Sequence, residues 1–141
     1  MQIDKFSDYA LRVLMVLAVS APNRVSVRKI ADTFNISENH VAKIATALVR
    51  EGYVHSQRGR AGGLSLAAEP HQISLGEVLR RMKKTPPVAE CFGEGNTCRI
   101  MPACGLRGPL KEAQEAFYAT LDSYTLADIT RQPKALVGLL G

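Results

Sequence analysis

Apolar residues in the first 20 positions recur with the period of a helix and lie on more than one side of it. Ser7 is a plausible N-cap, the pattern continues to about Val19, and the run Ser20-Ala21-Pro22-Asn23 ends it. A helix that is apolar most of the way round must be covered on several sides. We therefore expect either a core helix or a helix held between its own domain and a second subunit.

Two shorter helices are predicted next, each opened by a serine. Ser26 can cap the first and Ser37 the second, and Gly52 is placed to end the second. Only Asn35 and Ile36 lie between the two helices, and asparagine tolerates the left-handed backbone of a tight turn. The positions expected to face inward are Ile30, Ala31, Phe34, Val41, Ile44, Ala45 and Leu48.

A two-stranded wing is predicted after these helices. Residues 53–56 and 64–66 alternate apolar and polar positions as short strands do, and they flank a loop at 57–63 that is rich in glycine and arginine. Two capped helices joined by a tight turn and followed by such a wing are typical of a winged helix–turn–helix. A further helix opens with a capping box, Ser74 to Glu77, and keeps a helical apolar period to Met82.

The periodicity disappears from Lys83 to Cys104, and a segment of this length without regular structure is commonly functional in a small protein. After it, mainly apolar positions recur at steps of four and three, which is the spacing of a helix packed along another helix. That second helix can belong to the same chain or to a second subunit. The positions are Leu106, Leu110, Ala113, Phe117 and Thr120.

These elements predict a mainly α-helical fold with a small β wing, in which a winged helix–turn–helix is followed by a long dimerisation helix. We expect the DNA-binding domain at residues 1–82 and a cysteine-rich loop at 83–104. A dimerisation helix region follows at 105–130, and residues 131–141 form a C-terminal tail.

The composition is that of a globular protein whose positive charge is concentrated in its first half. The chain has 141 residues, of which 46% are apolar and 22% charged, with a net charge of +5. Residues 1–66 hold nine Lys/Arg against five Asp/Glu, and the remainder nine against eight. The excess lies where a nucleic-acid face is expected. No apolar run approaches the roughly 20 residues that span a bilayer, and no signal-peptide pattern is present, so we expect no membrane partner and a cytoplasmic location.

Polar side chains share one face of the second short helix. Asn39, Lys43, Thr46 and Arg50 are spaced by four, three and four residues, and asparagine and lysine can read base edges in the major groove. A solvated polar face is the alternative, but the neighbouring wing carries arginines that can reach phosphate or the minor groove. The candidate DNA contacts are Tyr9, Arg28, Ser37, Asn39, His40, Lys43, Thr46, Arg50, Arg58, Gly59 and Arg60.

Three cysteines, Cys91, Cys98 and Cys104, are spaced C-x6-C-x5-C. An odd number cannot pair internally, and structural zinc sites generally use closer C-x2-4-C pairs with four protein ligands. Three thiolates leave one position for an oxygen or nitrogen ligand, which iron–sulfur clusters tolerate. Zinc and three unconnected thiols remain the alternatives at this point.

Several stretches resemble the iron–sulfur winged-helix transcriptional repressors, a family with nitric-oxide-sensing (NsrR), cluster-assembly (IscR) and iron-responsive (RirA) branches. The nitric-oxide-sensing branch is the most similar, because the cluster-assembly branch has a histidine ligand where this chain has Arg107 and the iron-responsive branch usually has one more residue between the first two cysteines. The matching stretches are 6–12, 52–54, 58–63, the segment from Glu90 to Cys104, and 124–128.

The resemblance implies a homodimer that binds a palindromic double-stranded DNA operator and carries one iron–sulfur cluster per subunit, [4Fe-4S] or [2Fe-2S]. It implies that Cys91, Cys98 and Cys104 ligate the cluster and that Asp8 of the partner subunit completes the site. Nitric oxide would be the signal. From sequence alone, Asp8 is better interpreted as a carboxylate placed favourably in the first turn of a helix, and the ligand role comes from the resemblance.

Two other functions compete with this interpretation. The same scaffold could sense iron or cluster supply. A redox enzyme or electron carrier is the more distant alternative, but the chain has no C-x-x-C pair and no glycine-rich nucleotide motif, and His40, His55 and His71 are scattered. We therefore expect a regulator and not an enzyme.

Overall fold

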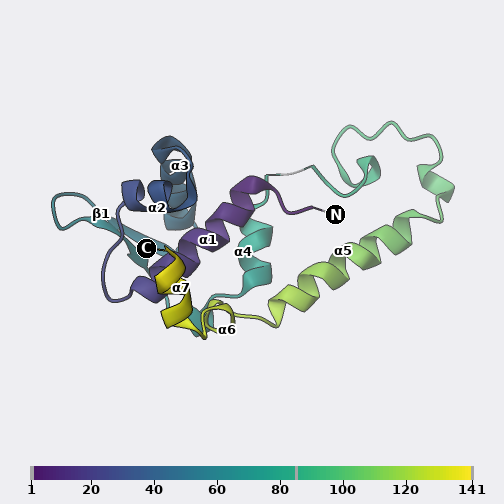
Figure 1. Ribbon diagram of the computed structural model, residues 1–141. Coiled ribbons are helices and arrows are strands. Elements are labelled where there is room, and N and C mark those ends of the chain that lie inside the picture. Colours follow the sequence, from purple (N-terminus) through teal and green to yellow (C-terminus); the bar gives the residue numbers. More distant parts are fainter. Residues whose placement is uncertain (1, 85, 141) are drawn as a thin grey trace.

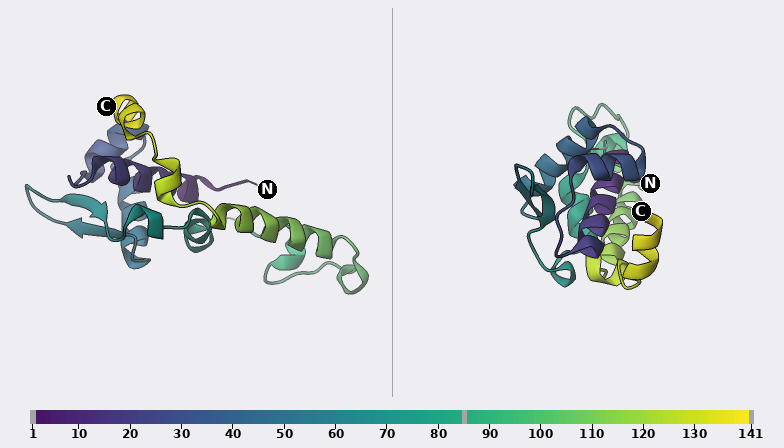
Figure 2. Two further views of the ribbon diagram at one scale, coloured as in Figure 1. Left: turned by 90° about the horizontal axis from the view of Figure 1, so that it is seen from below. Right: turned by 60° about the vertical axis from the view of Figure 1, so that its left-hand side comes forward.

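A computed structural model describes residues 2–84 and 86–140, and its elements follow the order of a winged helix–turn–helix (Figure 1). Helices α1 (Lys5–Ser20), α2 (Val27–Phe34), α3 (Glu38–Arg50) and α4 (Leu75–Met82) form a body that carries the wing on one side. Helix α5 (Arg107–Asp122) extends from the other side with the cysteine loop at its far end (Figure 2). The predicted fold class is confirmed.

Helix α1 is the central helix of the body and buries Ala10, Val13, Leu14 and Leu17 completely or almost so. The prediction of Ser7 as its N-cap is wrong, because Asp4 occupies that position. The Asp4 carboxylate accepts a hydrogen bond from the Ser7 N–H at 2.8 Å and another from the Ser7 hydroxyl at 2.9 Å. The helix therefore begins earlier than its apolar pattern indicates.

The helix–turn–helix forms through local hydrogen bonds that the sequence predicts. The Ser26 hydroxyl accepts from the Lys29 N–H and the Ser37 hydroxyl accepts from the His40 N–H, each at 3.1 Å. Asn35, in the turn between α2 and α3, has the left-handed backbone (φ 52°, ψ 50°). Four fully buried side chains pack the two helices into the core: Ile30, Val41, Ile44 and Leu48.

The wing is an antiparallel pair of strands, β1 (Val54–Gln57) and β2 (Gly63–Leu66). Val25, just before α2, exchanges two backbone hydrogen bonds with Leu64, at 3.0 and 2.8 Å. A Cβ on Gly63 would lie 2.9 Å from the Val25 carbonyl oxygen, so glycine permits this close approach. The wing is thereby fixed to the segment that leads into the helix–turn–helix.

The join between α4 and α5 is equally close. Gly76 of α4 is buried where a Cβ would meet Asp122 and the Tyr118 carbonyl oxygen of α5. The Arg80 guanidinium bonds Asp122 at 2.5 Å and lies 4.8 Å from the centre of the Tyr118 ring. These contacts fix the C-terminal half of α5 on the body.

The rest of α5 has little cover within the part of the chain that the structure describes. Tyr118 is its one buried residue, and Leu106, at the start of the predicted seam, is 62% exposed. The predicted helix is confirmed. Part of its seam is exposed, at Leu106, Ala113 and Thr120, whereas Phe117 is half-buried and lines a cavity with residues of α1 and α4. The cysteine loop before it is irregular, as predicted, with two short turns, η2 (Glu90–Phe92) and η3 (Met101–Ala103).

Three short helical segments were not evident in the sequence pattern. They are η1 (Pro70–Gln72), α6 (Leu126–Ile129) and α7 (Pro133–Leu140), and α7 lies in the predicted tail. Thr125 caps α6 through reciprocal hydrogen bonds with Asp128. Helix α7 lies beside α1, where Leu140 packs against the core. None of the described helices is both long and apolar enough to cross a membrane.

Candidate nucleic-acid interface and cysteine loop

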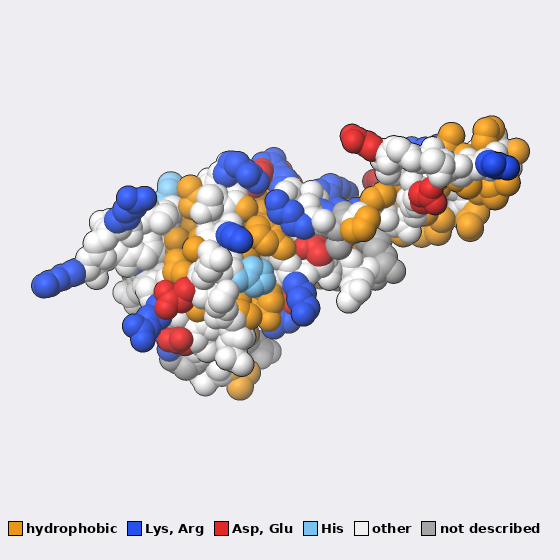
Figure 3. Space-filling model, turned by 90° about the horizontal axis from the view of Figure 1, so that it is seen from above, with side chains coloured by type: hydrophobic (Ala, Val, Ile, Leu, Met, Phe, Trp, Pro, Cys, Tyr) orange, Lys and Arg blue, Asp and Glu red, His pale blue; other side chains and the backbone are white. Residues whose placement is uncertain are grey.

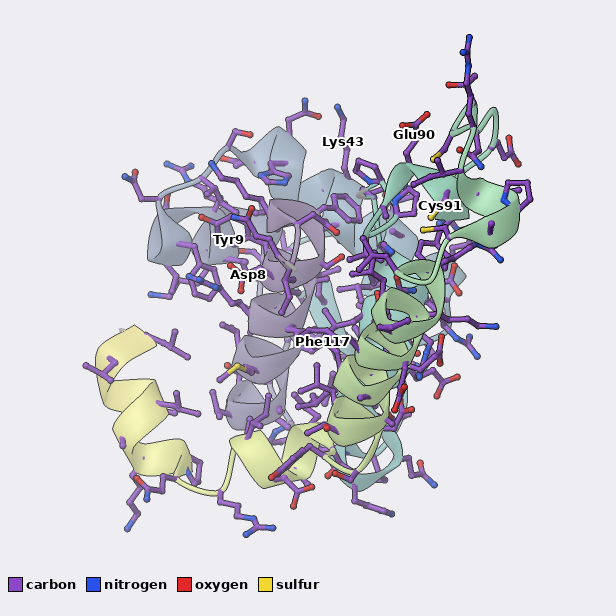
Figure 4. The ribbon with its side chains drawn as sticks, turned by 90° about the vertical axis from the view of Figure 1, so that its right-hand side faces the viewer. Asp8, Tyr9, Lys43, Glu90, Cys91 and Phe117 are labelled. Atoms are coloured by element: carbon purple, nitrogen blue, oxygen red, sulfur yellow. The ribbon has the colours of Figure 1, made fainter. Side chains whose placement is uncertain are left out.

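The outward face of α3 presents the polar side chains that the helical spacing predicts. Asn39, Lys43, Thr46 and Arg50 are all exposed, and Lys43 projects from the helix into solvent (Figure 4). Ser37, which caps α3, lies at the same end of the helix, so unpaired backbone N–H groups face outward there. This face can therefore offer both hydrogen-bonding side chains and a positive helix end to an anionic partner.

His40, Tyr9 and Thr46, which are predicted DNA contacts, also interact with other residues of their own chain. His40 is half-buried, and its ring lies 5.6 Å from the Tyr9 ring and 6.4 Å from the Phe6 ring. The Thr46 hydroxyl donates to the Ala42 carbonyl oxygen at 2.9 Å, so only its lone pairs remain for a ligand. His40 and Tyr9 thus connect α3 to α1 in addition to lying near the polar face.

Arginines with no acidic partner surround the wing. Arg28 at the start of α2 and Arg58 and Arg60 on the wing tip are exposed, and no carboxylate lies within 4 Å of them among the described residues. Gly59 between the two wing arginines has φ +102°, which an L side chain rarely adopts. The bend therefore aims both guanidinium groups away from the body.

Arg24 belongs to the same basic surface but is not among the residues that the sequence predicts. It lines a shallow surface hollow together with Arg60, Gly62 and Ser65, at the base of the wing. Its position one residue before Val25, which pairs with the wing, brings it there. A basic residue two positions before the predicted helix cap, Ser26, was the available signal. Figure 3 shows Lys and Arg side chains standing out at this end of the molecule.

The opposite end of the molecule carries the cysteine loop and is more apolar on its surface (Figure 3). Ile100 is 68% exposed, and Met101 and Leu106 are exposed beside it. Cys91, Cys98 and Cys104 are free thiols, each partly buried. Hydrogen bonds shape the first half of the loop: Glu90 accepts from the Thr97 hydroxyl at 3.2 Å, and Asn96 accepts from the Cys98 N–H at 2.9 Å.

The donor set of this loop fits an iron–sulfur cluster in chemistry but is incomplete within one chain. Three free thiols on irregular backbone can turn toward a common centre, and none is held in a disulfide. However, no three His, Cys, Asp or Glu side chains among the described residues are grouped as a metal site. The three thiols would have to come closer together to hold one cluster.

Asp8 does not lie at the cysteine loop of its own chain. In Figure 4, Asp8 and Cys91 lie on opposite sides of α1. The Asp8 carboxylate is held by the Arg12 guanidinium through two contacts, at 2.8 and 3.1 Å, and both side chains remain well exposed. Arg12 in turn lies over the Tyr9 ring, 5.2 Å from its centre. Asp8 is thus on an accessible face next to the helix–turn–helix.

Residues 3–132 match the model of the Rrf2 family, described as an iron-dependent transcriptional regulator. The chain belongs to the Rrf2 family. The HTH-type transcriptional regulator NsrR of Bacillus subtilis is 41% identical over 142 residues, covering 99% of this chain and 97% of that protein. The HTH-type transcriptional repressor NsrR of Streptomyces coelicolor is 40% identical, covering 100% and 95%.

Solved structures agree with this Rrf2 assignment. CymR of B. subtilis, named the global cysteine regulator, superposes with a TM-score of 0.72 at 26% identity over 93% of this chain and 97% of that one. IscR of T. potens superposes with a TM-score of 0.74 over 93% and 87%, and its 23% identity supports likeness of fold alone. The Rrf2 chain is therefore a DNA-binding transcriptional regulator and not an enzyme, as the sequence predicts.

Proposed function

We propose that this Rrf2 protein is a homodimeric repressor whose operator binding depends on an iron–sulfur cluster and is released by nitric oxide. The observation that carries the proposal is the set of three free, partly buried thiols, Cys91, Cys98 and Cys104, on one irregular loop. The NsrR relatives, 34–43% identical to this chain, supply the expectation of a repressor.

The second subunit would cover α5. Tyr118 is the one buried residue among the 16 from Arg107 to Asp122. Leu106 and Leu110 continue the apolar seam toward the cysteine loop. An apolar seam of this kind is stable in water only when another helix packs on it. We assign that role to α5 of the partner, which also brings two cysteine loops into one dimer.

Cys91, Cys98 and Cys104 would hold one cluster per subunit, and Asp8 of the partner subunit would complete the site. Asp8 is accessible and lies apart from its own loop, so a carboxylate supplied across the dimer suits it better than one supplied within the chain. To serve there, Asp8 must leave Arg12. When bound, the cluster supplies iron that nitric oxide attacks, and an oxygen ligand leaves that iron more accessible than a thiolate does.

The DNA-binding residues would act in pairs on a palindromic operator. The α3 face with Asn39 and Lys43 would read the major groove of each half-site, and Arg58 and Arg60 would contact phosphate or the minor groove beside it. Both half-sites must be met in register, so a change in the spacing of the two α3 helices weakens specific binding without unfolding the protein. Such a protein acts in the cytoplasm, where DNA is present and thiols stay reduced.

The test is a titration of nitric oxide into anaerobically purified, cluster-loaded protein. We expect visible absorption from the cluster, loss of that absorption as nitric oxide is added, and a parallel loss of operator binding in a gel-shift assay. Mössbauer spectra of the starting protein distinguish [4Fe-4S] from [2Fe-2S]. Operator binding that persists after the absorption has collapsed contradicts the proposal.

A sensor of iron or cluster supply is the second candidate, and the family description as an iron-dependent regulator favours it. Its signature is loss of operator binding when iron is chelated in the presence of an excess of nitric-oxide scavenger. If chelation releases the operator and nitric oxide does not, the supply sensor replaces the nitric-oxide sensor as the function.

A further inference from the structure

The Asp4 carboxylate joins two parts of the chain that are far apart in sequence. It caps α1 through the Ser7 N–H and accepts from the Ser7 hydroxyl, and Ser7 is only 2% exposed. The same carboxylate also accepts a hydrogen bond from the Lys84 N–H at 3.3 Å, across 80 residues of sequence. Lys84 lies just beyond α4, where the cysteine loop leaves the body.

Further contacts surround this hydrogen bond. The Lys84 ammonium lies 5.2 Å from the centre of the Phe6 ring. Asp4 and Ser7 also line a cavity of about 260 Å³ with Pro87, Val88 and Phe117, so the start of the loop, α1 and α5 meet there. Figure 4 shows Phe117 on α5 directed toward α1. The base of the cysteine loop is therefore held against the first turn of α1.

The first turn of α1 also packs against α3, the recognition helix of the proposed DNA interface. The His40 ring of α3 lies next to both Phe6 and Tyr9, with ring centres 6.4 and 5.6 Å apart. A displacement of the first turn of α1 must therefore move the aromatic contacts that position the N-terminal end of α3. This end carries Asn39 and Lys43 on its outward face.

We propose that Asp4 is a positioning residue that connects the cysteine loop to the recognition helix of the same chain, through its bond to the Lys84 N–H and the contact of Phe6 with His40. This inference rests on the proposed function, because the state of the loop matters only if the loop holds the signal. It differs from the role of Asp8, which would act on the loop of the partner subunit. The two residues would give the first turn of α1 a link to each of the two loops.

The decisive substitution is Lys84→Pro, which deletes the N–H that reaches Asp4. Lys83 has an extended ψ of 127°, within the range that a residue before proline adopts. Lys84→Ala is the matched control, because it keeps the N–H and removes only the contact with Phe6. Both variants leave the cysteines, Asp8 and the DNA-contact residues in place.

The measurement is the ratio of operator affinities of the cluster-loaded and cluster-free proteins. Couplings between two sites generally amount to about 5- to 150-fold. We expect Lys84→Ala to keep the wild-type ratio within about twofold and Lys84→Pro to reduce it at least fivefold, with the absorption spectrum of the cluster unchanged. An unchanged ratio in Lys84→Pro overturns the role of Asp4 while leaving the proposed function intact. A wild-type ratio of one overturns both.

A second measurement needs no cluster and remains available if Lys84→Pro folds poorly. Asp4→Ser keeps a residue that caps α1, but it removes the second carboxylate oxygen: in Asp4, Oδ1 accepts from the Ser7 N–H and Oδ2 accepts from the Lys84 N–H. In cluster-free protein, we expect amide hydrogen exchange of Lys84 to become at least about fivefold faster in Asp4→Ser, while amides in the middle of α1 keep their wild-type rates. Equal exchange of Lys84 in both proteins shows that Asp4 does not hold the loop and overturns the inference.

Discussion

At the scale of single residues, the arginines divide into those with an acidic partner and those without one. Arg12, Arg80 and Arg131 each bind a carboxylate of their own chain. Of those without a carboxylate partner among the described residues, Arg99 and Arg107 lie at the cysteine-loop end, and the others lie at the wing and at the start of α2. A guanidinium that is not neutralised within its chain keeps its full attraction for phosphate. The unpaired set near the wing is Arg24, Arg28, Arg58 and Arg60.

Removal of one wing arginine should therefore weaken DNA binding and make the binding less dependent on salt. We expect Arg58→Ala to reduce the slope of log affinity against log salt by about 0.9 per half-site, and to weaken operator and non-operator DNA alike. Arg131→Ala, which removes an arginine paired with Asp128, is the control and should leave the slope unchanged. Fluorescence anisotropy over a salt series gives the slopes. A wild-type slope for Arg58→Ala removes it from the interface.

Asp4 also predicts how stability depends on pH. Burial raises the pKa of Asp4, but hydrogen bonds from the Ser7 and Lys84 N–H groups and the Ser7 hydroxyl outweigh it, so the pKa lies below its usual value of 3.8. A carboxyl with a lowered pKa in the folded state stabilises the protein above its unfolded pKa, and this contribution disappears as the pH falls through the folded value.

We therefore expect Asp4→Ala to lower the free energy of unfolding by about 1 kcal/mol at pH 7, the usual cost of losing an N-cap. As the pH falls below 3.8, the difference from wild type should shrink, because the wild-type carboxyl becomes protonated once the pH passes its lowered folded pKa. Urea unfolding of cluster-free wild type and Asp4→Ala, at pH 7 and at a pH below 3.8, measures this difference in unfolding free energy. A difference that is equal at the two pH values would mean that the charge of Asp4 does not stabilise α1.

At the scale of elements, the parts of the fold that depend on local hydrogen bonds could be predicted from sequence, and those that depend on distant partners could not. Ser26 and Ser37 cap their helices as predicted, because a cap needs only residues three positions away. Asp4 was missed in favour of Ser7 because either can cap, and the bond from Lys84 is invisible in sequence. Helix α7 was missed because its residues after Lys134 are apolar or glycine, so the sequence shows no separate polar face. Leu140 is the residue that packs it against the core.

The same division applies to the candidate site. The outward positions of α3 follow from helical spacing, and the three cysteines are evident by their type. By contrast, the role of His40 as a link between α1 and α3 depends on two aromatic rings brought in by a distant helix. The basic contribution of Arg24 depends on the pairing of Val25 with Leu64. Neither tertiary contact has a periodic signature.

The close join of α4 and α5 predicts opposite effects for two glycines. A Cβ at Gly76 would lie 2.1 Å from Asp122 Oδ1 and 2.8 Å from two backbone atoms of α5, whereas nothing lies within 4 Å of a Cβ at Gly108. We expect Gly76→Ala to destabilise the protein by about 1–3 kcal/mol. Gly108→Ala, in the exposed first turn of α5, should stabilise it by about 0.4–1 kcal/mol. Chemical unfolding of both variants measures this, and a neutral Gly76→Ala would mean that the helices are not in close contact.

At the scale of the whole molecule, the candidate DNA-contact surface and the cysteine loop lie at opposite ends (Figure 2). Within one chain, two routes of contact connect these ends. One is the close packing of α5 on α4 at Gly76, and the other is the hydrogen bond that joins the first turn of α1 to the loop at Lys84. Both routes end at α1 or its neighbours in the core. A dimer in which Asp8 reaches the partner's loop would add a third route to the same turn of α1.

Whether Asp8 acts across the dimer can be decided by mixing two defective chains. An Asp8→Ala chain lacks the carboxylate but keeps its cysteines, and a Cys98→Ser chain lacks one thiol but keeps Asp8. If the carboxylate crosses the dimer, the heterodimer contains one complete site, made of the three cysteines of the first chain and Asp8 of the second. If it acts within its own chain, no site in the heterodimer is complete.

We expect the heterodimer, isolated through two different affinity tags, to hold one cluster per dimer with the wild-type absorption spectrum and the wild-type rate of loss under a chelator. The Asp8→Ala homodimer, with three thiols per loop, should lose its cluster faster, and the Cys98→Ser homodimer faster still. A heterodimer that behaves as the average of the two homodimers would place Asp8 within its own chain. That result would also remove the cross-subunit link from the switch and leave the bond between Asp4 and Lys84 as its connection to α1.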